Sequence, residues 1–509
     1  MSTARTWAVA LTGVDGHMVE VEADLSNQTP EFKIIGLPDK SLGEAVQRVH
    51  NACKNAGLDL PRRRLTVNLS PASLPKHGAG FDLSIAVSTL AAGGALERRS
   101  IADTVHIGEL GLDGRIRPVP GVLPAVFAAA RAGFERIIVP RGNEAEARLV
   151  PGVEVRAAGS LAEVAVWHGA DVEVPDVDAV AVGRTGPTPD HALDLADVVG
   201  QDEAVEALIV AAAGGHHLLL SGPPGAGKTM LARRLPGILP PLREQEALEV
   251  ASIRSLSGEP ITALESLPPL EAPHHSASVA ALVGGGSRVA RPGAIARAHR
   301  GVLFLDEAAE FSRVALDALR QPLEAGVIDV HRAGFTARFP ARFQLLLAMN
   351  PCPCGNHGVR GAECVCPPMA IRRYATRLSG PLRDRVDIDL SVTRVAASRA
   401  TAGGRSEVTT ARARARVEAA RARAADRWRG TPWRRNADIP GTWLRQGSLR
   451  LPPSTRASLD RTLERGALTL RGYDRVLRLA WTMADLAELE NPGIDEIGRA
   501  LHLKRGLTP

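Results

Sequence analysis

Several residue types are scarce in this chain, and each shortage narrows the class of protein. Only five of the 509 residues are cysteine and four of these cluster, which argues against a disulfide-stapled secreted scaffold and for a metal clip. No apolar stretch reaches the roughly 18 residues that a membrane-spanning helix needs. The amino terminus has too short an apolar core for a secretory signal. We therefore expect a cytoplasmic protein.

Lysine is also scarce, with six residues, although the chain carries a net charge of +6. The cations are therefore almost all arginine. A modest basic excess is compatible with nucleic-acid binding but does not require it. The apolar content of 45% is ordinary for a globular protein, and the length predicts roughly two to four domains.

The stretch HHLLLSGPPGAGKTMLARR, residues 216–234, holds the most specific motif of the chain. Leu218–Leu220 reads as a buried strand, and a helical pattern begins at Thr229. Between them lies a phosphate-binding loop, formed by Gly222, Pro223, Pro224, Gly225, Ala226, Gly227, Lys228 and Thr229. Lys228 would reach the β- and γ-phosphates, and Thr229 would supply a hydroxyl to Mg²⁺. The chain is predicted to bind a nucleoside triphosphate.

A second apolar run, Val302–Leu305, ends in two carboxylates. Such an ending is common in parallel sheets, but beside a phosphate loop it reads as a Walker B strand. Asp306 would then hold Mg²⁺ through water, and Glu307 would orient and deprotonate the attacking water. The next predicted strand, Phe343–Met349, ends at Asn350. We interpret Asn350 as a polar sensor of the γ-phosphate rather than a simple turn residue.

Four cysteines follow Asn350 as two C-x-C pairs separated by nine residues: Cys352, Cys354, Cys364 and Cys366. Four thiolates at this spacing suit tetrahedral Zn²⁺, with His357 as an alternative ligand. Reduced cysteines in a loop are the competing interpretation.

Arginine is concentrated between Arg394 and Arg435, where twelve arginines stand against three acids. Much of this segment, Thr410–Trp428, is predicted to be one helix. Two interpretations stay open for it, a solvated helix and a nucleic-acid contact. Trp428 and Trp433 either stack on bases or dock the helix on its neighbours.

The first 170 residues alternate strands and helices. Strands are expected at 7–11, 18–23, 32–35, 65–69, 105–107 and 137–140, and helices at 39–56, 81–92, 122–132 and after a capping box at Ser160. This region resembles the Lon-protease-like domain through the motifs LPKHGAGFDL (74–83) and GLDGRIRPVPG (111–121). An active Lon protease has a serine in the first motif and a lysine after the second. Gly80 and Leu123 stand there, so the resemblance implies the fold without proteolysis.

Over its whole length the chain resembles the YifB/ComM family, and from about 195 to 505 the magnesium-chelatase-like AAA+ ATPases. The motifs that carry this resemblance are GPPGAGKT, APHHSAS, GGGS, GVLFLDE, RQPLEAG, AMNPCPCG and SGPLRDRVD. The implied fold class is α/β. Its parts are a Lon-protease-like (ribosomal S5 domain 2-like) α+β domain at 1–170, a linker at 171–190, an AAA+ core with a parallel sheet at 191–393, an Arg-rich helical connector at 394–440 and a helical lid at 441–509.

The resemblance also implies a function, that of a hexameric ATP-driven helicase acting on DNA in natural transformation or recombination. Arg385 would act on ATP bound by the neighbouring subunit, and Arg383 replaces a leucine that is usual in the family. Arg471 would contact the nucleotide from the lid, with Arg475 or Arg478 taking that role in a shifted register.

A central pore is a further implication, lined by the insert around Gly284–Gly286 and by a hairpin around Gly334. Arg332 and Arg338 on that hairpin are the expected DNA contacts. The competing functions are a magnesium-chelatase-type ATPase subunit, a protein-remodelling ATPase and a Lon-type protease.

Overall fold

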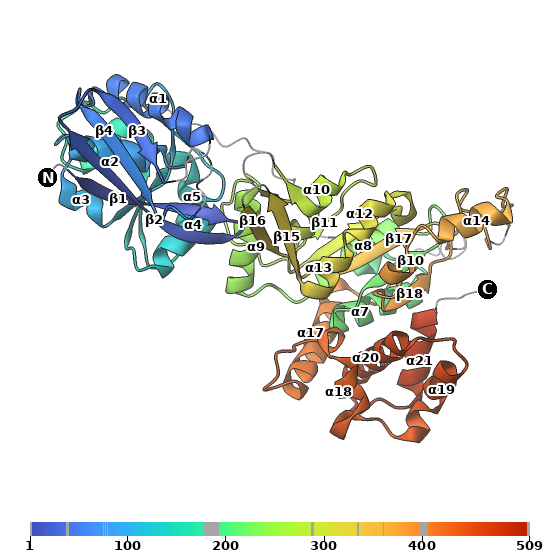
Figure 1. Ribbon diagram of the computed structural model, residues 1–509. Helices are drawn as coiled ribbons and strands as arrows, with labels where there is room; N and C mark the ends of the chain where they lie inside the picture. The colour runs from blue at the N-terminus through green and yellow to red at the C-terminus, as the bar shows by residue number, and fades with distance from the viewer. Residues whose placement is uncertain are drawn as a thin grey trace.

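The computed structural model describes residues 3–36, 40–74, 76, 78, 80–177, 193–286, 290–332, 335–359, 361–395 and 406–505. Three lobes follow one another along the chain: an N-terminal α/β lobe, a central α/β lobe and a C-terminal helical lobe (Figure 1). Within these ranges, no helix has the length and apolar character needed to cross a membrane.

A seven-stranded sheet in the order β3-β4-β2-β1-β5-β8-β9 forms the N-terminal lobe. Its strands are β1 (Ala4–Thr12), β2 (Asp15–Ser26), β3 (Glu31–Ile35), β4 (Arg64–Ser70), β5 (Thr104–His106), β8 (Arg136–Pro140) and β9 (Glu154–Ala158). The β1–β2 and β2–β4 pairs are antiparallel and the others are parallel. Alternate side chains of β2, among them Val19 and Val21, are fully buried, because successive residues of a strand face opposite sides of the sheet.

The helices of this lobe are α1 (Lys40–Asn55), α2 (Asp82–Ala92), α3 (Arg98–Ala102), α4 (Val122–Arg131), α5 (Glu144–Ala147) and α6 (Leu161–Trp167), with a small hairpin of β6 (Glu109–Leu110) and β7 (Ile116–Arg117). The expected strands and helices are confirmed, whereas β9, α3, α5 and the small hairpin were not predicted. The capping box at Ser160 is half formed: its hydroxyl accepts from the N–H of Glu163, but the Glu163 carboxylate binds Arg141 and the N–H of Gly159. Asp39, the first residue of the helix expected at 39–56, and residues 178–190 of the expected linker lie outside the described residues.

The central lobe contains a five-stranded parallel sheet in the order β11-β14-β17-β10-β18. Its strands are β10 (Leu218–Ser221), β11 (Leu270–Glu271), β14 (Val302–Leu305), β17 (Gln344–Met349) and β18 (Ile388–Ser391), and its longer helices are α7 (Asp202–Gly214), α8 (Lys228–Ile238) and α9 (Glu244–Leu256). Every residue of β14 and β17 is buried. Runs of this kind are typical of parallel sheets that are covered on both faces. The edge strand β11 is too short to have been predicted.

Two prolines affect the helices of the central lobe in different ways. The apolar periodicity of Val314–Ala325 is typical of a single helix, but the segment is broken into α12 (Arg313–Asp317) and α13 (Arg320–Ala325). Pro322 explains the break, because it has no N–H for the carbonyl four residues earlier and its ring clashes there. Conversely, Pro236 does not end α8, which runs on to Ile238.

Two short hairpins project from the central sheet. One pairs β12 (Gly284–Gly285) with β13 (Arg291–Pro292), and the other pairs β15 (Val327–Arg332) with β16 (Phe335–Pro340). The second is the predicted hairpin, although Gly334 and the side chain of Arg332 lie outside the described residues. Short helices complete the lobe: α10 (Val279–Val283), α11 (Ala294–Arg297), α14 (Pro368–Ala375) and α15 (Gly380–Arg383).

The N-terminal lobe packs directly on the central lobe. A Cβ on Gly13, at the β1–β2 turn, would lie 2.1 Å from the carbonyl oxygen of Arg338 on β16. Helix α4 packs against α9. Nearby, the hydroxyl of Ser255 on α9 donates to the buried carboxylate of Glu146 on α5 at 2.6 Å. Burial raises the pKa of Glu146. The hairpin predicted for a pore thus rests on the N-terminal lobe.

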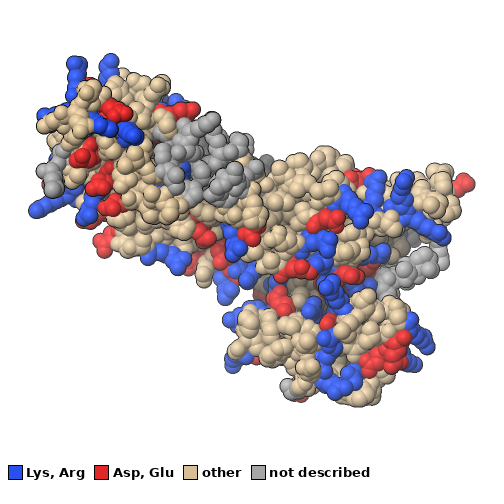
Figure 2. Space-filling view, in the orientation of Figure 1, with Lys and Arg blue, Asp and Glu red and all other residues tan. Residues whose placement is uncertain are grey.

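The C-terminal lobe is helical, as the periodicity after residue 443 predicts. It contains α17 (Thr410–Arg427), α18 (Gly441–Arg445), α19 (Pro453–Glu464), α20 (Leu470–Leu486) and α21 (Ile494–Arg505). Helix α17 joins this lobe to the central one, since it packs against α7, α8 and α20. On the face drawn in Figure 2, basic and acidic side chains are interspersed over both lobes.

Candidate functional site

The phosphate loop connects β10 to α8, and its glycines are required by the backbone. Gly225 and Gly227 have φ of +77° and +88°, a region that other residues rarely adopt. At Gly222 a Cβ would lie 2.1 Å from the carbonyl oxygen of Val392. Gln201 links the loop to the segment after β18, because its side-chain amide donates to the carbonyls of Ala226 and Thr393.

Lys228 is almost fully buried at the start of α8. Its ammonium donates to the carbonyls of Gly222 (2.6 Å) and Pro223 (3.0 Å) and to Oδ1 of Asn350 (3.0 Å). Burial lowers the pKa of Lys228, and the carboxylates of Asp306 and Glu307 oppose that shift. The cation therefore has only neutral hydrogen-bond acceptors, which an anionic phosphate can replace.

Asp306 and Glu307 follow β14 at the same edge of the sheet as the phosphate loop. The Thr229 hydroxyl donates to Oδ2 of Asp306 at 2.6 Å, so the two predicted Mg²⁺ ligands are adjacent. Residues 224–230, Asp306, Glu307, Met349 and Asn350 line one cleft of about 480 Å³. The residues predicted to bind and hydrolyse a nucleotide thus come together, apart from the arginines. A hydroxyl, a carboxylate and an ammonium in this arrangement fit the Mg²⁺ and phosphates of ATP.

One residue of this cleft was not predicted. His275, in the APHHSAS motif, places Nδ1 3.1 Å from Oε2 of Glu307. The motif was recognised as part of the family resemblance, but nothing in its spacing indicates that it reaches the end of β14. The segment that carries His275 lies near Glu307 because the preceding strand β11 pairs with β14, and β11 was not predicted.

The predicted arginines line a different cleft, of about 610 Å³, between the central and C-terminal lobes. Arg385 and Arg471 both line it, and no residue of the phosphate loop does. Arg385 is nearly buried; it pairs with Glu324 and donates to the carbonyl of Pro381. Arg383 instead pairs with Asp389 at 2.8 Å, outside this cleft.

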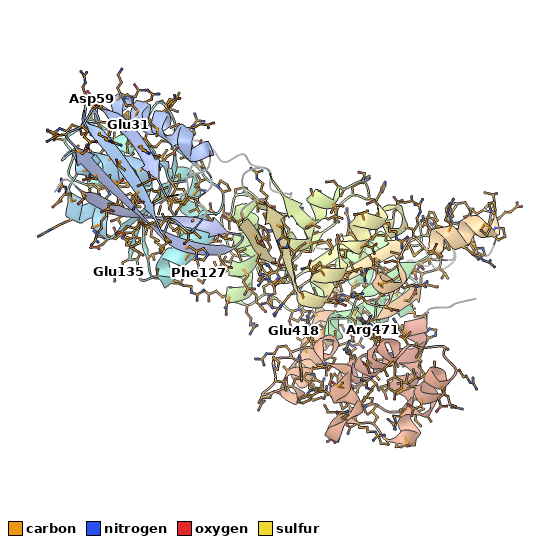
Figure 3. All side chains as sticks on the ribbon, in the orientation of Figure 1. Glu31, Asp59, Phe127, Glu135, Glu418 and Arg471 are labelled. Atoms are coloured by element: carbon orange, nitrogen blue, oxygen red, sulfur yellow. The ribbon has the colours of Figure 1, made fainter. Side chains whose placement is uncertain are left out.

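The structure distinguishes the three lid arginines. Arg475 pairs with Asp387, and Arg478 donates to the carbonyl of Ile439 at 2.7 Å. Arg471 is exposed at the junction of the two lobes, where Figure 3 labels it, and its guanidinium makes no hydrogen bond or ion pair within the described part of the chain. Arg471 is therefore the lid arginine that is free to meet a ligand.

Asp387 anchors the lid beside Arg385. It is 2% exposed and accepts from the N–H of His217 at 2.9 Å, besides pairing with Arg475. Burial alone would raise the pKa of Asp387, but Arg475 and His216 outweigh it and hold the pKa well below its usual range. The ion pair fixes helix α20, and with it Arg471, relative to the central sheet.

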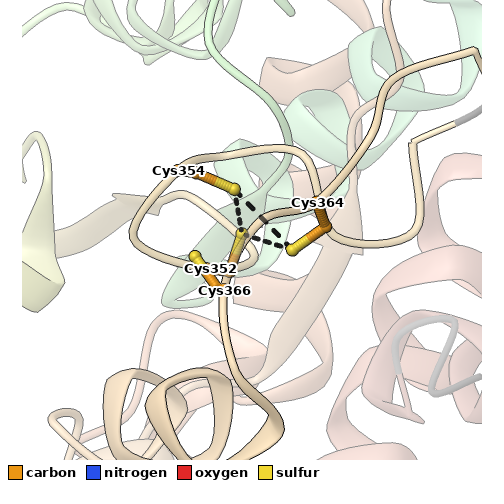
Figure 4. Close-up of side chains that lie close together, drawn as sticks. All are labelled: Cys352, Cys354, Cys364 and Cys366. Atoms are coloured by element: carbon orange, nitrogen blue, oxygen red, sulfur yellow. Dashed lines mark hydrogen bonds between the residues drawn. The ribbon is translucent and has the colours of Figure 1, made fainter.

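The four clustered cysteines follow β17 directly, and their side chains point toward one another (Figure 4). The Sγ atoms of Cys352, Cys354 and Cys364 are 3.4–3.7 Å apart, and all four sulfurs lie within 4.8 Å of one another. Sulfurs at 2.3 Å from a tetrahedral Zn²⁺ are about 3.8 Å apart, so the cluster fits this ion. A backbone hydrogen bond from Asn356 and the thiol of Cys352 lower the pKa of Cys354 to about 6.

His357, the alternative ligand, does not replace a cysteine of the cluster. His357 contributes its backbone N–H to Cys352 Sγ at 3.3 Å, and its imidazole is not part of the cluster. The loop is also tied to the nucleotide site: a Cβ on Gly355 would lie 2.4 Å from Pro224 of the phosphate loop.

The arginines of α17 are engaged in the structure, which decides between the two interpretations of this helix. Arg414, Arg421 and Arg423 donate to the carbonyls of Gly237, Ala212 and Asp485, in the last turns of α8, α7 and α20. Arg416 pairs with Glu206, and Arg427 with Asp485. Carbonyls at helix C-termini lack partners within the helix and attract cations. The arginines of α17 therefore hold the helix against α7, α8 and α20, and their role is structural.

The two tryptophans agree with this result. Trp428 is 1% exposed and donates to Oδ1 of Asn436 at 3.0 Å. Trp433 packs edge-on against Trp443, with ring centroids 4.8 Å apart. Trp428 therefore docks the helix and has no face open to a base.

The two positions that correspond to a Lon protease's serine and lysine offer no nucleophile. Leu123 is fully buried in the core under α4, and a Cβ on Gly80 would meet no atom within 4 Å. Neither residue type can attack a peptide bond or activate a group that does.

Parts of the sequence match three protein families. Residues 194–400 match the family described as magnesium chelatase, subunit ChlI, and residues 407–504 match its C-terminal family. Residues 21–143 match the family described as subunit ChlI of Mg-chelatase. The matched ranges fall in the central, C-terminal and N-terminal lobes, respectively.

Similar proteins cover nearly the whole chain. The Mycobacterium tuberculosis protein Rv2897c is 49% identical over 99% of both chains. Competence protein ComM of Haemophilus influenzae is 41% identical, and YifB of Escherichia coli 39%, each over 96% of this chain and 94% of its own. A partial similarity, 28% identity over 31% of this chain, is to Lon protease of Mycolicibacterium smegmatis.

Proposed function

The chain belongs to the YifB/ComM family of magnesium-chelatase-like AAA+ ATPases, and we propose that it is a hexameric motor that uses ATP to move on DNA. In this proposal Lys228 binds the β- and γ-phosphates, and Thr229 and Asp306 hold Mg²⁺. Bound Mg²⁺ would neutralise phosphate charge during hydrolysis. Glu307 activates the attacking water, and Asn350 orients the γ-phosphate.

The observation that carries the proposal is the separation of the reactive groups between two clefts. The phosphate loop and Glu307 line one, whereas Arg385 and Arg471 line the other. Phosphoryl transfer needs a cation on the transferred group, and a cleft of this kind can receive it from a neighbouring subunit. We infer that both arginines act on ATP held by the next subunit. A head-to-tail interface of this kind closes into a ring.

A ring has a central channel, and the two hairpins are the candidates to line it. The DNA-contacting group that the structure favours on them is Arg291 on β13. Arg291 is exposed, and its guanidinium makes no hydrogen bond or ion pair with another described residue. Arg338, by contrast, pairs with Asp329 at 2.8 Å, so part of its charge is already offset.

We further propose that the four cysteines hold one Zn²⁺, which would stiffen the loop between Asn350 and α14. The 3.4–3.7 Å sulfur spacings support this, as does the absence of a competing disulfide among the described cysteines. We also propose the domain division drawn from the sequence, with a non-catalytic N-terminal domain that supports the β15–β16 hairpin.

The proposal is tested by ATPase assays on the full chain with single-stranded, duplex and four-way-junction DNA at several salt concentrations. DNA should stimulate hydrolysis, and its affinity should fall roughly linearly with salt on logarithmic axes. Arg291→Ala should remove most of the stimulation and lower the salt slope by about one. Arg465→Ala is the control, because Arg465 is exposed in the lid and lies on neither hairpin, and this variant should behave as the wild type.

Stimulation should also be reduced when Arg332→Ala and Arg338→Ala are combined, though the Arg338 contribution should be the smaller. Absence of stimulation by every DNA at every salt concentration would contradict the motor on DNA. It would favour a chelatase-type ATPase subunit or a protein-remodelling ATPase.

A further inference from the structure

A third arginine, Arg342, lines the same cleft as Arg385 and Arg471. It lies in the short connection between β16 and β17. Its side chain is exposed, and its guanidinium makes no hydrogen bond or ion pair with another described residue. The charged end of Arg342 is therefore available to a ligand.

The backbone of Arg342 is held from both sides. Its N–H donates to Nδ1 of His299 at 3.0 Å, and its carbonyl accepts from the N–H of Arg300 at 2.8 Å. Arg300 has φ of +61°, a left-handed conformation that is uncommon for residues other than glycine and costs free energy. A residue in a strained conformation thus supports the backbone of Arg342.

The two supporting residues are themselves anchored to α9. Because Nδ1 of His299 accepts a hydrogen bond, its proton lies on Nε2, which donates to Oε2 of Glu249 at 3.1 Å. Arg300 donates to the same oxygen at 3.0 Å. The hydrogen bond from His299, together with Arg300, lowers the pKa of Glu249 to about 2, so this carboxylate stays charged. The stem of Arg342 is also confined, since a Cβ on Gly326 would lie 3.0 Å from its Cγ.

The other charged groups of the cleft are mostly paired with one another. Three arginines form ion pairs with carboxylates there: Arg385 with Glu324, Arg435 with Asp438 and Arg475 with Asp387. Within the described part of the chain, Arg342 and Arg471 are the arginines of the cleft that lack a partner, and Asp384 is the carboxylate that lacks one. Two unpaired cations against one carboxylate favour the binding of an anion.

We propose that Arg342 is a third arginine of the ATP site between subunits and binds a phosphate group of the ATP held by the next subunit. This contact rests on the proposed function, in which the cleft meets the phosphate loop of a neighbour. A planar guanidinium can donate two hydrogen bonds to one phosphate. Because the backbone and stem of Arg342 are already fixed, little ordering is needed on binding, which favours affinity. Arg342 also follows β16 directly, so it joins the phosphate contact to the β15–β16 hairpin.

Steady-state ATPase assays on the full chain test the contact. Arg342→Ala should lower kcat/KM for ATP about ten- to a hundredfold, the loss expected for a hydrogen bond to a charged group. Arg342→Lys, which keeps the charge but not the planar fork, should recover part of this loss. Arg313→Ala is the matched control, because Arg313 is 82% exposed on α12 and lines neither cleft, and it should behave as the wild type.

Mixing two variants distinguishes a contact across the interface from an effect within one subunit. Arg342→Ala protein mixed with Lys228→Ala protein should be more active than Arg342→Ala protein alone, since some interfaces then combine an intact loop with an intact Arg342. The midpoint of thermal unfolding of Arg342→Ala should equal that of the wild type, because the side chain has no partner to lose.

Two results would overturn the role of Arg342 while leaving the proposed function intact. One is wild-type kcat/KM in Arg342→Ala. The other is a mixture of Arg342→Ala and Lys228→Ala that gains no activity, although the mixture of Arg385→Ala and Lys228→Ala does. If neither mixture gains activity although mixed rings form, the shared ATP site itself is refuted, and the role of Arg342 with it.

Discussion

Arg421 offers the sharpest test of the arginine-rich helix α17. Its Nε and Nη2 both donate to the carbonyl of Ala212, at 3.0 and 2.6 Å, in the last turn of α7. Arg421→Ala removes two charge-assisted hydrogen bonds and leaves that carbonyl without a partner. Hydrogen bonds to charged groups are each worth about 1.5–3 kcal/mol, and a cation at a helix C-terminus adds about 0.3–1 kcal/mol.

Burial of the guanidinium works in the other direction, since it lowers the pKa of Arg421 and disfavours the charge. We therefore expect Arg421→Ala to lower the free energy of unfolding by about 2–3 kcal/mol. For a domain of this size, that loss lowers the midpoint of thermal unfolding by roughly 4–12 °C.

The assay is thermal unfolding of the full chain, with DNA affinity measured in parallel. Arg429→Ala is the matched control, because Arg429 lies on the same segment and makes only an exposed pair with Asp426, worth at most about 1 kcal/mol. Arg421→Ala should lower the unfolding midpoint and leave DNA affinity unchanged, and Arg429→Ala should change neither. An unchanged midpoint together with weakened DNA binding would refute the structural role.

Three other predictions follow from the clefts and the buried groups. Glu307→Gln should retain ATP binding and lose at least about a hundredfold in hydrolysis, measured by nucleotide titration and turnover, because the general base is removed; near-normal turnover would contradict its role. Purified protein should contain about one Zn²⁺ per chain by elemental analysis. The double variant Cys352→Ser, Cys366→Ser should contain no zinc and should unfold at a lower temperature. Zinc-free wild-type protein from a zinc-replete culture would argue against the site. His168 is buried and hydrogen-bonded to His106, and burial lowers its pKa to about 4. Below the unfolded pKa of about 6.5, the unfolded chain therefore binds a proton at this residue that the folded chain does not. From pH 7.5 to 5 this residue alone should lower the free energy of unfolding by about 2 kcal/mol, and the unfolding profile of His168→Gln should be less steep than that of the wild type.

Much of the fold and of the ATP-binding cleft was accessible from the sequence because both depend on local patterns. The run Leu218–Leu220 and the loop after it are contiguous, and so are Val302–Leu305 and its two carboxylates. In a parallel sheet, strand ends at one edge meet, so these groups and Asn350 had to lie close together.

The features that the sequence missed depend on packing between distant segments. The same arginine pattern in α17 fits solvent, DNA or helix ends, and only the positions of α7, α8 and α20 decide among them. His275 follows β11, which pairs with β14 and so brings this segment close to Glu307. A strand of two residues is too short to show any periodicity in the sequence. Arg471 rather than Arg475 is the lid arginine that can meet a ligand, because Arg475 pairs with the buried Asp387. No local sequence pattern identifies that pair.

We propose that neighbouring subunits complete each ATPase site, and a mixing experiment tests this arrangement. Arg385→Ala protein and Lys228→Ala protein should each be inactive alone, because one lacks the cation given to its neighbour and the other lacks its own phosphate ligand. Mixed in equal amounts, they should regain activity, since about a quarter of the interfaces in a head-to-tail ring would combine an intact loop with an intact arginine. A mixture that stays inactive although mixed rings form, or full wild-type activity from a proven monomer, would contradict the claim.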